Sequence, residues 1–193
     1  MLGLKLPTDP RWVNVVEKNI EEILTDHAYC EQKAATNSVN LIIQFPEYTD
    51  LVDAMLELAK EELEHFQEVH QKIKERGYTL GRERRDDYVF EINSFIRKGH
   101  SRNIVLVDKL LFSALIEARS CERFKVLSEN IKDDDLKEFY HRLMVSEANH
   151  YTLFLGFARK YAEGVDVEKR WQEWLAYEAE VIGKYGKRET VHG

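Results

Sequence analysis

The chain contains 193 residues, of which 44% are hydrophobic and 33% are charged, and its formal net charge is −7. With 9 glycines and 3 prolines it has little turn chemistry for a β-sandwich, and no run approaches the roughly 18 apolar residues that a membrane span needs. The negative charge disfavours avid, sequence-independent binding of nucleic acid, which depends on many phosphate-neutralising lysines and arginines.

The cysteines and the first residues indicate the cellular compartment. Cys30 and Cys121 are too few for a disulfide framework and match no zinc motif, so we expect both to be reduced. The N-terminal run MLGLKLPTDPRW contains no apolar signal region with a cleavage site. These features predict a cytoplasmic protein that does not associate with a membrane.

The first half of the chain is predicted to form two long helices. The first begins at Asp9-Pro10, where a capping residue precedes a proline at the first helical position, and it ends before Pro46. The second covers Thr49 to Arg76, and Gly77 is its expected C-terminal cap. Apolar residues recur along both at helical spacing, so each helix should bury one face.

The second half repeats this pattern after a connector at residues 77–102, which contains a short predicted helix from Asp87 to Phe95. A third long helix follows and ends near Glu129. Acidic residues at positions 133–135 favour the start of a fourth helix, because they stabilise its N-terminal dipole. Gly164 ends that helix, and a shorter fifth helix runs from Val167 to about Lys184. We therefore expect a single all-α domain over residues 1–193.

Charged residues interrupt the apolar stripes at two matching places. The sequence Glu-x-x-His occurs at Glu62 and His65 and again at Glu147 and His150. Residues three apart lie on the same face of a helix, so each pair can direct both side chains to one point. Burying such groups is costly unless something compensates them, and a metal ion does so.

The other two long helices each place one carboxylate in the stripe, Glu31 and Glu117. A shift of 85 or 86 positions superposes the first half of the set on the second, which reveals an internal repeat. One Glu from each of two helices and Glu-x-x-His from each of the other two is the signature of ferritin-like bundles that bind two metals. The pattern predicts a ferritin-like four-helix bundle with an additional C-terminal helix and the metal ligands Glu31, Glu62, His65, Glu117, Glu147 and His150.

The donor set also indicates which metal would bind. Carboxylates with one imidazole per metal suit iron or manganese better than a thiolate-preferring metal, and four carboxylates neutralise two divalent ions. By their position in the motif, Glu62 and Glu147 are the expected bridging ligands, and Glu31 and Glu117 the terminal ones.

Several residues near the predicted ligands are candidates either for other ligands or for side chains that hold the ligands in place. Glu61 and Glu64 flank the first motif but leave the apolar stripe, which favours a solvated surface. His27 lies one turn before Glu31, where supporting that ligand from behind or belonging to the core is favoured over a role as a seventh ligand. Arg119 and Glu122 could pair behind the metal or form a surface ion pair, and the sequence leaves both possibilities open.

Four segments resemble a known family of bacterial tRNA hydroxylases that act on 2-methylthio-N6-isopentenyladenosine. They are residues 26–42 (DHAYCEQKAATNSVNLI), 58–77, 110–128 (LLFSALIEARSCERFKVLS) and 138–154, and the resemblance covers nearly the whole chain. The six ligands of that family correspond to the six residues found above. The resemblance implies a di-iron monooxygenase that uses O2 and hydroxylates the isopentenyl side chain next to the anticodon. It also implies an external electron donor, a ferredoxin or a reductase, because the sequence contains no flavin or nicotinamide motif.

The connector offers limited physical support for an RNA partner. The stretch from Arg76 to Arg102 contains seven basic and four acidic residues, which gives it a net charge of +3 in an acidic chain. Tyr78 and Tyr88 lie among them and could stack on the bases of a tRNA anticodon loop. A solvated connector would have the same composition, so the tRNA assignment depends mainly on the resemblance. The candidate RNA-binding residues are Arg82, Arg84, Arg85, Arg97, Lys98 and Arg102.

Two other functions fit the same metal-binding pattern. A rubrerythrin-like or ferritin-like iron oxidase or peroxidase would need no RNA surface, although a rubrerythrin would normally add a cysteine-rich domain. A helical bundle that only binds a partner would not need six intact ligands.

Overall fold

The structure is a computed structural model that describes residues 2–185 and 190–192, and it is entirely helical in these residues, without a strand. The elements in chain order are η1 (Pro10–Trp12), α1 (Val13–Val16), α2 (Ile20–Gln44), α3 (Thr49–Glu75), α4 (Asp87–Asn93), α5 (Arg102–Asn130), α6 (Asp134–Lys160) and α7 (Val167–Tyr185). The all-α prediction is therefore confirmed. None of the described helices combines the length and apolarity that crossing a membrane requires.

The chain divides into two compact units. One, called here the α2–α3 unit, comprises Lys18–Arg85 and Glu189–Val191, and the other, the α5–α6 unit, comprises Met1–Glu17, Asp86–Arg188 and His192–Gly193. Each unit contains one pair of long helices from the internal repeat. The expectation that residues 1–193 form a single domain stays a prediction.

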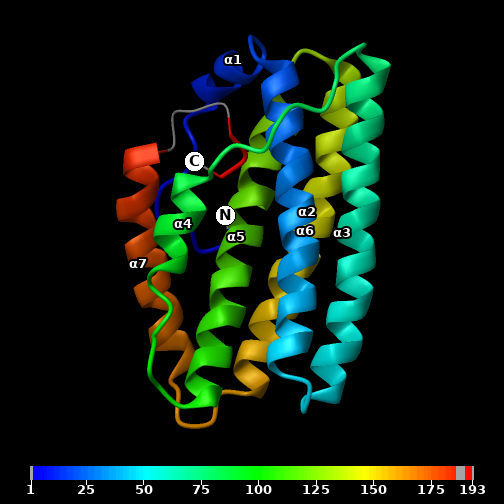
Figure 1. The fold of residues 1–193 in the computed structure, drawn as a ribbon. Helices are drawn as coiled ribbons and strands as arrows, with labels where there is room; N and C mark the ends of the chain where they lie inside the picture. The colour runs from blue at the N-terminus through cyan, green and yellow to red at the C-terminus, as the bar shows by residue number, and fades with distance from the viewer. Residues whose placement is uncertain (1, 186–189, 193) are drawn as a thin grey trace. The chain divides into compact units, whose positions relative to one another are not determined.

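The α2–α3 unit is an antiparallel helix pair (Figure 1). The two helices pack through apolar stripes, in which Leu24, Leu51 and Met55 are fully buried. Gly77 ends α3 with φ at +73°, and the next N–H, that of Tyr78, donates to the carbonyl of Ile73. This is the glycine cap expected from the sequence, and it satisfies carbonyls that the helix end would otherwise leave exposed.

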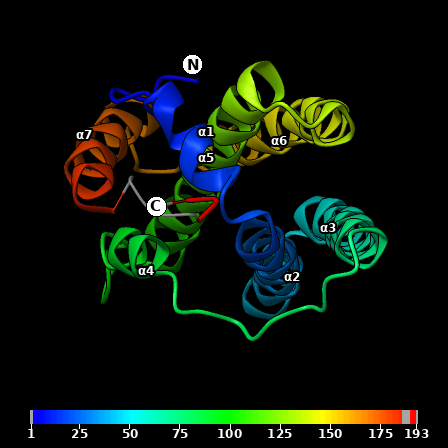
Figure 2. The same ribbon diagram turned by 90° about the horizontal axis from the view of Figure 1, so that it is seen from above.

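In the α5–α6 unit, α5 packs along α6 in the opposite direction, and α4 and α7 lie side by side and contact α5 (Figures 1 and 2). Asp133 caps α6 by accepting a hydrogen bond from the N–H of Leu136 at 3.1 Å. The short helix expected from Asp87 to Phe95 is α4, and the fifth expected helix is α7. Both begin at the predicted residue.

The first predicted helix differs from the structure, because it is not continuous from Asp9 to Pro46. After η1 and α1 the chain leaves helical geometry at Asn19, where φ is −138° and ψ is 43°, and α2 then begins. The short N-terminal helices instead bury Trp12 and Val16, and the guanidinium of Arg123 on α5 lies 4.1 Å from the centroid of the Trp12 ring. Glu17 binds Lys132 beyond the end of α5. These contacts with distant segments outweigh the local preference for one helix.

Candidate metal centre

In the α2–α3 unit, three of the predicted ligands lie together, and we call them the first cluster: Glu31 on α2 and Glu62 and His65 on α3. All three are buried, with exposed fractions of 4%, 1% and 7%. His65 Nδ1 lies 3.6 Å from Glu31 Oε2 and 3.5 Å from Glu62 Oε2. The helical phase read from the sequence therefore places two carboxylates and one imidazole at one point.

The metal-free first cluster holds a proton strongly. Burial disfavours the charged form of His65, but the carboxylates of Glu31 and Glu62 favour it more and raise its pKa to about 10. Burial would raise the pKa of Glu31, but hydrogen bonds from His27 and His65 lower it far below its usual value. The cluster is thus built to hold a positive charge, which a proton or a metal ion can supply.

In the α5–α6 unit, the other three predicted ligands form the second cluster: Glu117 on α5 and Glu147 and His150 on α6. Their exposed fractions are 5%, 3% and 3%. A carboxylate oxygen of Glu117 and a ring nitrogen of His150 lie within 4.8 Å of each other. Glu147 lies one turn before His150 on the same buried face of α6. The second cluster therefore repeats the donor types of the first.

Both donor sets suit a hard or intermediate divalent metal. Each offers two carboxylates and one imidazole, and neither contains a thiolate, a combination that favours iron or manganese. Their burial limits the access of bulk water, so the charge of bound ions would be balanced by the cluster itself.

His27 is fully buried one turn before Glu31, and its Nε2 lies 2.6 Å from Glu31 Oε1. Glu61 and Glu64 are exposed, although a Glu61 oxygen lies 3.9 Å from His65 Nε2. His27 is therefore in place to support Glu31.

Arg119 and Glu122 pair at 3.0 Å, but both are buried rather than at the surface. The Arg119 guanidinium also donates to Glu178 on α7, and Glu122 accepts hydrogen bonds from the N–H and hydroxyl of Thr8. The pair thus fixes α7 and the N-terminal segment to α5. Glu178 was not singled out from the sequence. Its place in the apolar stripe of α7, four residues after Trp174, indicates a buried carboxylate.

The candidate RNA-binding residues occupy different surroundings. Arg82, Arg84 and Arg85 are exposed in the α2–α3 unit, and Arg84 lies 3.2 Å from Glu22. In the α5–α6 unit Lys98 and Arg102 are exposed. Arg97 differs from the others, because its backbone N–H and its guanidinium donate to Asp108 on α5 at 2.8 to 2.9 Å. The structure therefore gives Arg97 a role in holding the end of the connector.

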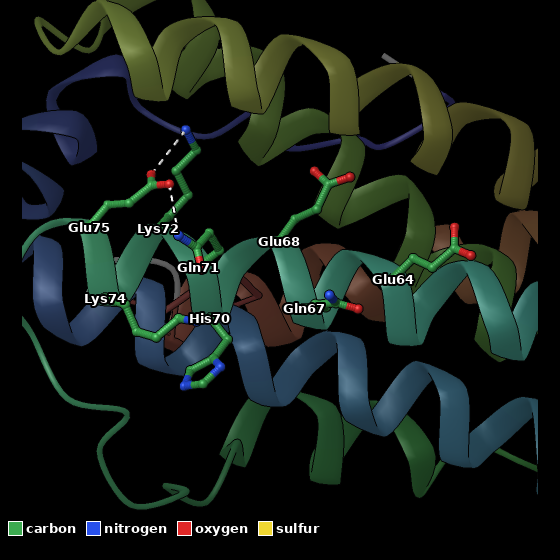
Figure 3. A pocket seen from close by; sticks show the side chains of 8 residues that line it. All are labelled: Glu64, Gln67, Glu68, His70, Gln71, Lys72, Lys74 and Glu75. Atoms are coloured by element: carbon green, nitrogen blue, oxygen red, sulfur yellow. Dashed lines mark hydrogen bonds and ion pairs between the residues drawn. The ribbon is translucent and has the colours of Figure 1, made fainter.

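A hollow of about 630 Å³ is lined by side chains of α3 (Figure 3). Its walls are polar, and Glu75 binds Gln71 and Lys72 across one end. Neither Glu62 nor His65 lines the hollow, so the hollow is not part of the first cluster. The lining residues are Glu64, Gln67, Glu68, His70, Gln71, Lys72, Lys74 and Glu75.

Comparison with known proteins identifies relatives over almost the whole chain. The family model described as tRNA-(MS2IO6A)-hydroxylase (MiaE) matches residues 2–193. The chain is 36% identical to the tRNA 2-(methylsulfanyl)-N(6)-isopentenyladenosine(37) hydroxylase of Pseudomonas putida, over 93% of this chain and 86% of the relative. It is 28% identical to the enzyme of the same description from Salmonella typhimurium, over 93% and 83%.

Among solved structures, a protein from Synechococcus described as having aldehyde deformylating oxygenase activity matches with a TM-score of 0.90 and 32% identity. The match covers 98% of this chain and 95% of that one. This likeness confirms the ferritin-like fold that was expected from the spacing of the Glu-x-x-His motifs.

Proposed function

Because the chain belongs to the tRNA-(MS2IO6A)-hydroxylase family, we propose that it hydroxylates the isopentenyl side chain of 2-methylthio-N6-isopentenyladenosine beside the anticodon of tRNA. The observation that carries this proposal is the match of the family model to residues 2–193. The names of the two curated relatives support the same substrate. A tRNA substrate also favours a cytoplasmic location for this protein.

We propose that the first and second clusters hold two iron ions through Glu31, Glu62, His65, Glu117, Glu147 and His150. The buried oxygen-rich donor sets fit these ions, and the structural neighbour with oxygenase activity supports the assignment. When bound, the irons supply the activation of O2 that a C–H bond requires. Manganese would fit the same donors and is distinguished by metal analysis of active protein.

The residues of the chain orient the proposed ligands, balance the charge of the metals and exclude water from the site. Glu31, Glu62, Glu117 and Glu147 balance the positive charge of the metals, and their burial excludes water that would intercept a reactive oxidant. His65 gives up the proton that it shares with Glu31 and Glu62 when it becomes a ligand. His27 holds one oxygen of Glu31 and thereby fixes the direction of the other.

The proposed reaction needs electrons from outside the chain. One oxygen atom of O2 enters the C–H bond as a hydroxyl group and the other leaves as water, which consumes two electrons and two protons. The sequence contains no flavin or nicotinamide motif, so we propose that a ferredoxin or a reductase is the donor.

The decisive experiment supplies the iron-loaded, chemically reduced protein with O2 and with tRNA that carries the prenylated but unhydroxylated adenosine. Nucleosides released from the tRNA are then analysed by mass spectrometry, and we expect a gain of one oxygen atom on the prenyl group. A Glu62→Ala variant, which lacks a proposed ligand, is the matched control and should give no product.

Adding peroxide, Fe(II) or an aldehyde to the same assay distinguishes the alternative activities. If the protein consumes peroxide or Fe(II) rapidly and leaves the tRNA unchanged, it is an iron oxidase or peroxidase. If an aldehyde is deformylated while the tRNA is unchanged, the activity named for the Synechococcus neighbour is the better description.

A further inference from the structure

The two clusters repeat the same ligands, but the side chains behind them do not repeat. The shift that superposes Glu31 on Glu117 brings His27 onto Ser113, and the shift that superposes His65 on His150 brings Glu61 onto Ser146. Both supporting positions are therefore ionisable in the first cluster and are neutral serines in the second. This difference is a property of the helices themselves, because each position lies one turn before its ligand.

In the first cluster, the two oxygens of Glu31 have separate partners. Oε1 lies 2.6 Å from His27 Nε2, and Oε2 lies 3.6 Å from His65 Nδ1. His27 has no exposed surface, so its ring is fixed by the packing around it. A carboxylate held at one oxygen presents only the other to a metal, and its orientation is set before the metal arrives.

The second support in this cluster is Glu61, whose side chain is 47% exposed. One of its oxygens lies 3.9 Å from His65 Nε2, the ring nitrogen that faces away from Glu31 and Glu62. This separation is longer than a hydrogen bond, so the carboxylate of Glu61 acts on the ring through its negative charge, which favours a positive charge at the first cluster.

The second cluster has uncharged serines at the same positions. The hydroxyl of Ser113 donates to the backbone carbonyl of Lys109 at 3.1 Å, and Ser146 Oγ lies 3.4 Å from His150 Nε2. Within the part of the chain that the structure describes, the carboxylate of Glu117 accepts no hydrogen bond. Its orientation is therefore less constrained than that of Glu31.

From this difference we infer that the two metal positions are unequal, with a tight first cluster and a labile second cluster, and that His27 is the positioning residue responsible. The inference rests on the proposed metal-binding function and goes beyond it by assigning an order of filling. Mutating a residue that hydrogen-bonds to a metal ligand typically lowers the affinity for the metal by about 10- to 100-fold. We therefore expect the first cluster to bind at least about tenfold more tightly than the second.

The test is a titration of metal-free protein with Co(II) under anaerobic conditions, followed by visible absorption and by calorimetry. The wild type should bind in two resolved steps. In His27→Leu the tighter step should weaken by about 10- to 100-fold and merge with the second. His27→Gln retains a donor and should recover part of the difference, whereas Ser113→Ala, its counterpart in the repeat, should leave both steps unchanged.

Three further variants assign the steps and guard against a folding defect. Glu117→Ala should retain the tight step, and Glu31→Ala should lose it. Glu61→Gln lies at the surface, where substitution is well tolerated, and should weaken the tight step alone. Circular dichroism shows whether each variant keeps its helices.

The outcomes separate this inference from the proposed function. Two equal steps in the wild type would refute the inequality, and a tight step that survives both His27→Leu and Glu61→Gln would refute the role given to these residues; either result leaves a two-metal enzyme intact. A wild-type protein that binds no metal would refute the proposed function and the inference together.

Discussion

At the scale of single residues, His65 shows how the metal-free protein anticipates a cation. The carboxylates of Glu31 and Glu62 stabilise its protonated form more than burial destabilises it, so its pKa is raised to about 10. A histidine that ligates a metal must be neutral, so as a proposed ligand His65 has to lose its proton before it binds. Proton and metal compete for the same position.

This competition predicts that metal affinity rises with pH. Below a pH of about 10 the metal-free His65 is protonated, so binding releases a proton, and raising the pH removes the competitor. From about pH 7 to pH 8.5 the apparent Co(II) affinity of the first cluster should increase about tenfold per pH unit. Calorimetry in buffers with different ionisation enthalpies measures the released proton, and an affinity independent of pH would contradict the prediction.

Cys121 gives a second prediction at this scale. Burial and the nearby carboxylates of Glu117 and Glu122 raise the pKa of its thiol to about 12, so the reactive thiolate is scarce. Cys30 is only half-buried. We expect iodoacetamide to modify Cys30 first in the folded protein and to modify both cysteines in denaturant, as read by mass spectrometry. Equal rates in the folded protein would show that Cys121 is accessible.

At the scale of the elements, the capping residues made most helix ends predictable. Gly77 and Asp133 act within one turn of the ends they define, so the sequence carries the whole signal. The break before α2 was not predictable in this way. It depends on the packing of Trp12 under Arg123, a residue more than a hundred positions away, and no local pattern records such a contact.

The same distinction applies to the buried charges. The six proposed ligands could be predicted because the helical period of 3.6 residues places each of them on the apolar face of its own helix. Asp108 and Glu178 were missed, since their partners Arg170 and Arg119 lie 62 and 59 positions away. A carboxylate in an apolar stripe thus signals an unknown buried partner. Only the internal repeat of Glu-x-x-His made a metal the predicted partner for the six proposed ligands.

Asp108 is the residue that holds α7 and the end of the connector to α5. It is fully buried and accepts hydrogen bonds from the guanidinium groups of Arg97 and Arg170, both at 2.9 Å. Burial would raise the pKa of its carboxyl group, but these two arginines lower it. The carboxylate is therefore charged in the folded protein at neutral pH.

Asp108→Ala should consequently be strongly destabilising. Loss of the carboxylate leaves the largely buried guanidinium of Arg170 without its main counter-charge, which typically costs about 3 to 5 kcal/mol. Thermal or urea unfolding measures the change. Asp53→Ala, on the exposed face of α3, is the control and should change the free energy of unfolding by less than about 0.5 kcal/mol. Equal stability of the two variants would contradict this role.

At the scale of the whole molecule, an acidic protein that acts on tRNA must concentrate its positive charge locally. Arg82, Arg84 and Arg85 are exposed on the segment that follows α3, within the stretch from Arg76 to Arg102 that has a net charge of +3. Contacts to phosphate release counterions, and each contact steepens the dependence of affinity on salt. The exposed arginines are therefore the part of the candidate RNA surface that is easiest to test.

Changing Arg82, Arg84 and Arg85 together to Ala should weaken tRNA binding and flatten its salt dependence. If all three contact phosphates, the slope of log affinity against log salt should fall by roughly two to three. Filter binding or fluorescence anisotropy over a salt series measures both effects. A control variant with the same loss of charge from exposed positions elsewhere should keep the wild-type slope, and it replaces Lys5, Lys125 and Lys169. Identical slopes for the two variants would remove the connector from the RNA surface.

If the histidine and glutamate behind one cluster make it bind metal more tightly than the other, the same residues also set how the enzyme responds to iron supply. If the first cluster fills before the second and turnover requires both, iron added up to about half of the full amount produces protein that is loaded but inactive. A plot of activity against iron should then show a lag followed by a steep rise, instead of a straight line from the origin. A cell short of iron would hold a reserve of half-filled enzyme, and a modest recovery of iron would restore hydroxylation of its tRNA abruptly.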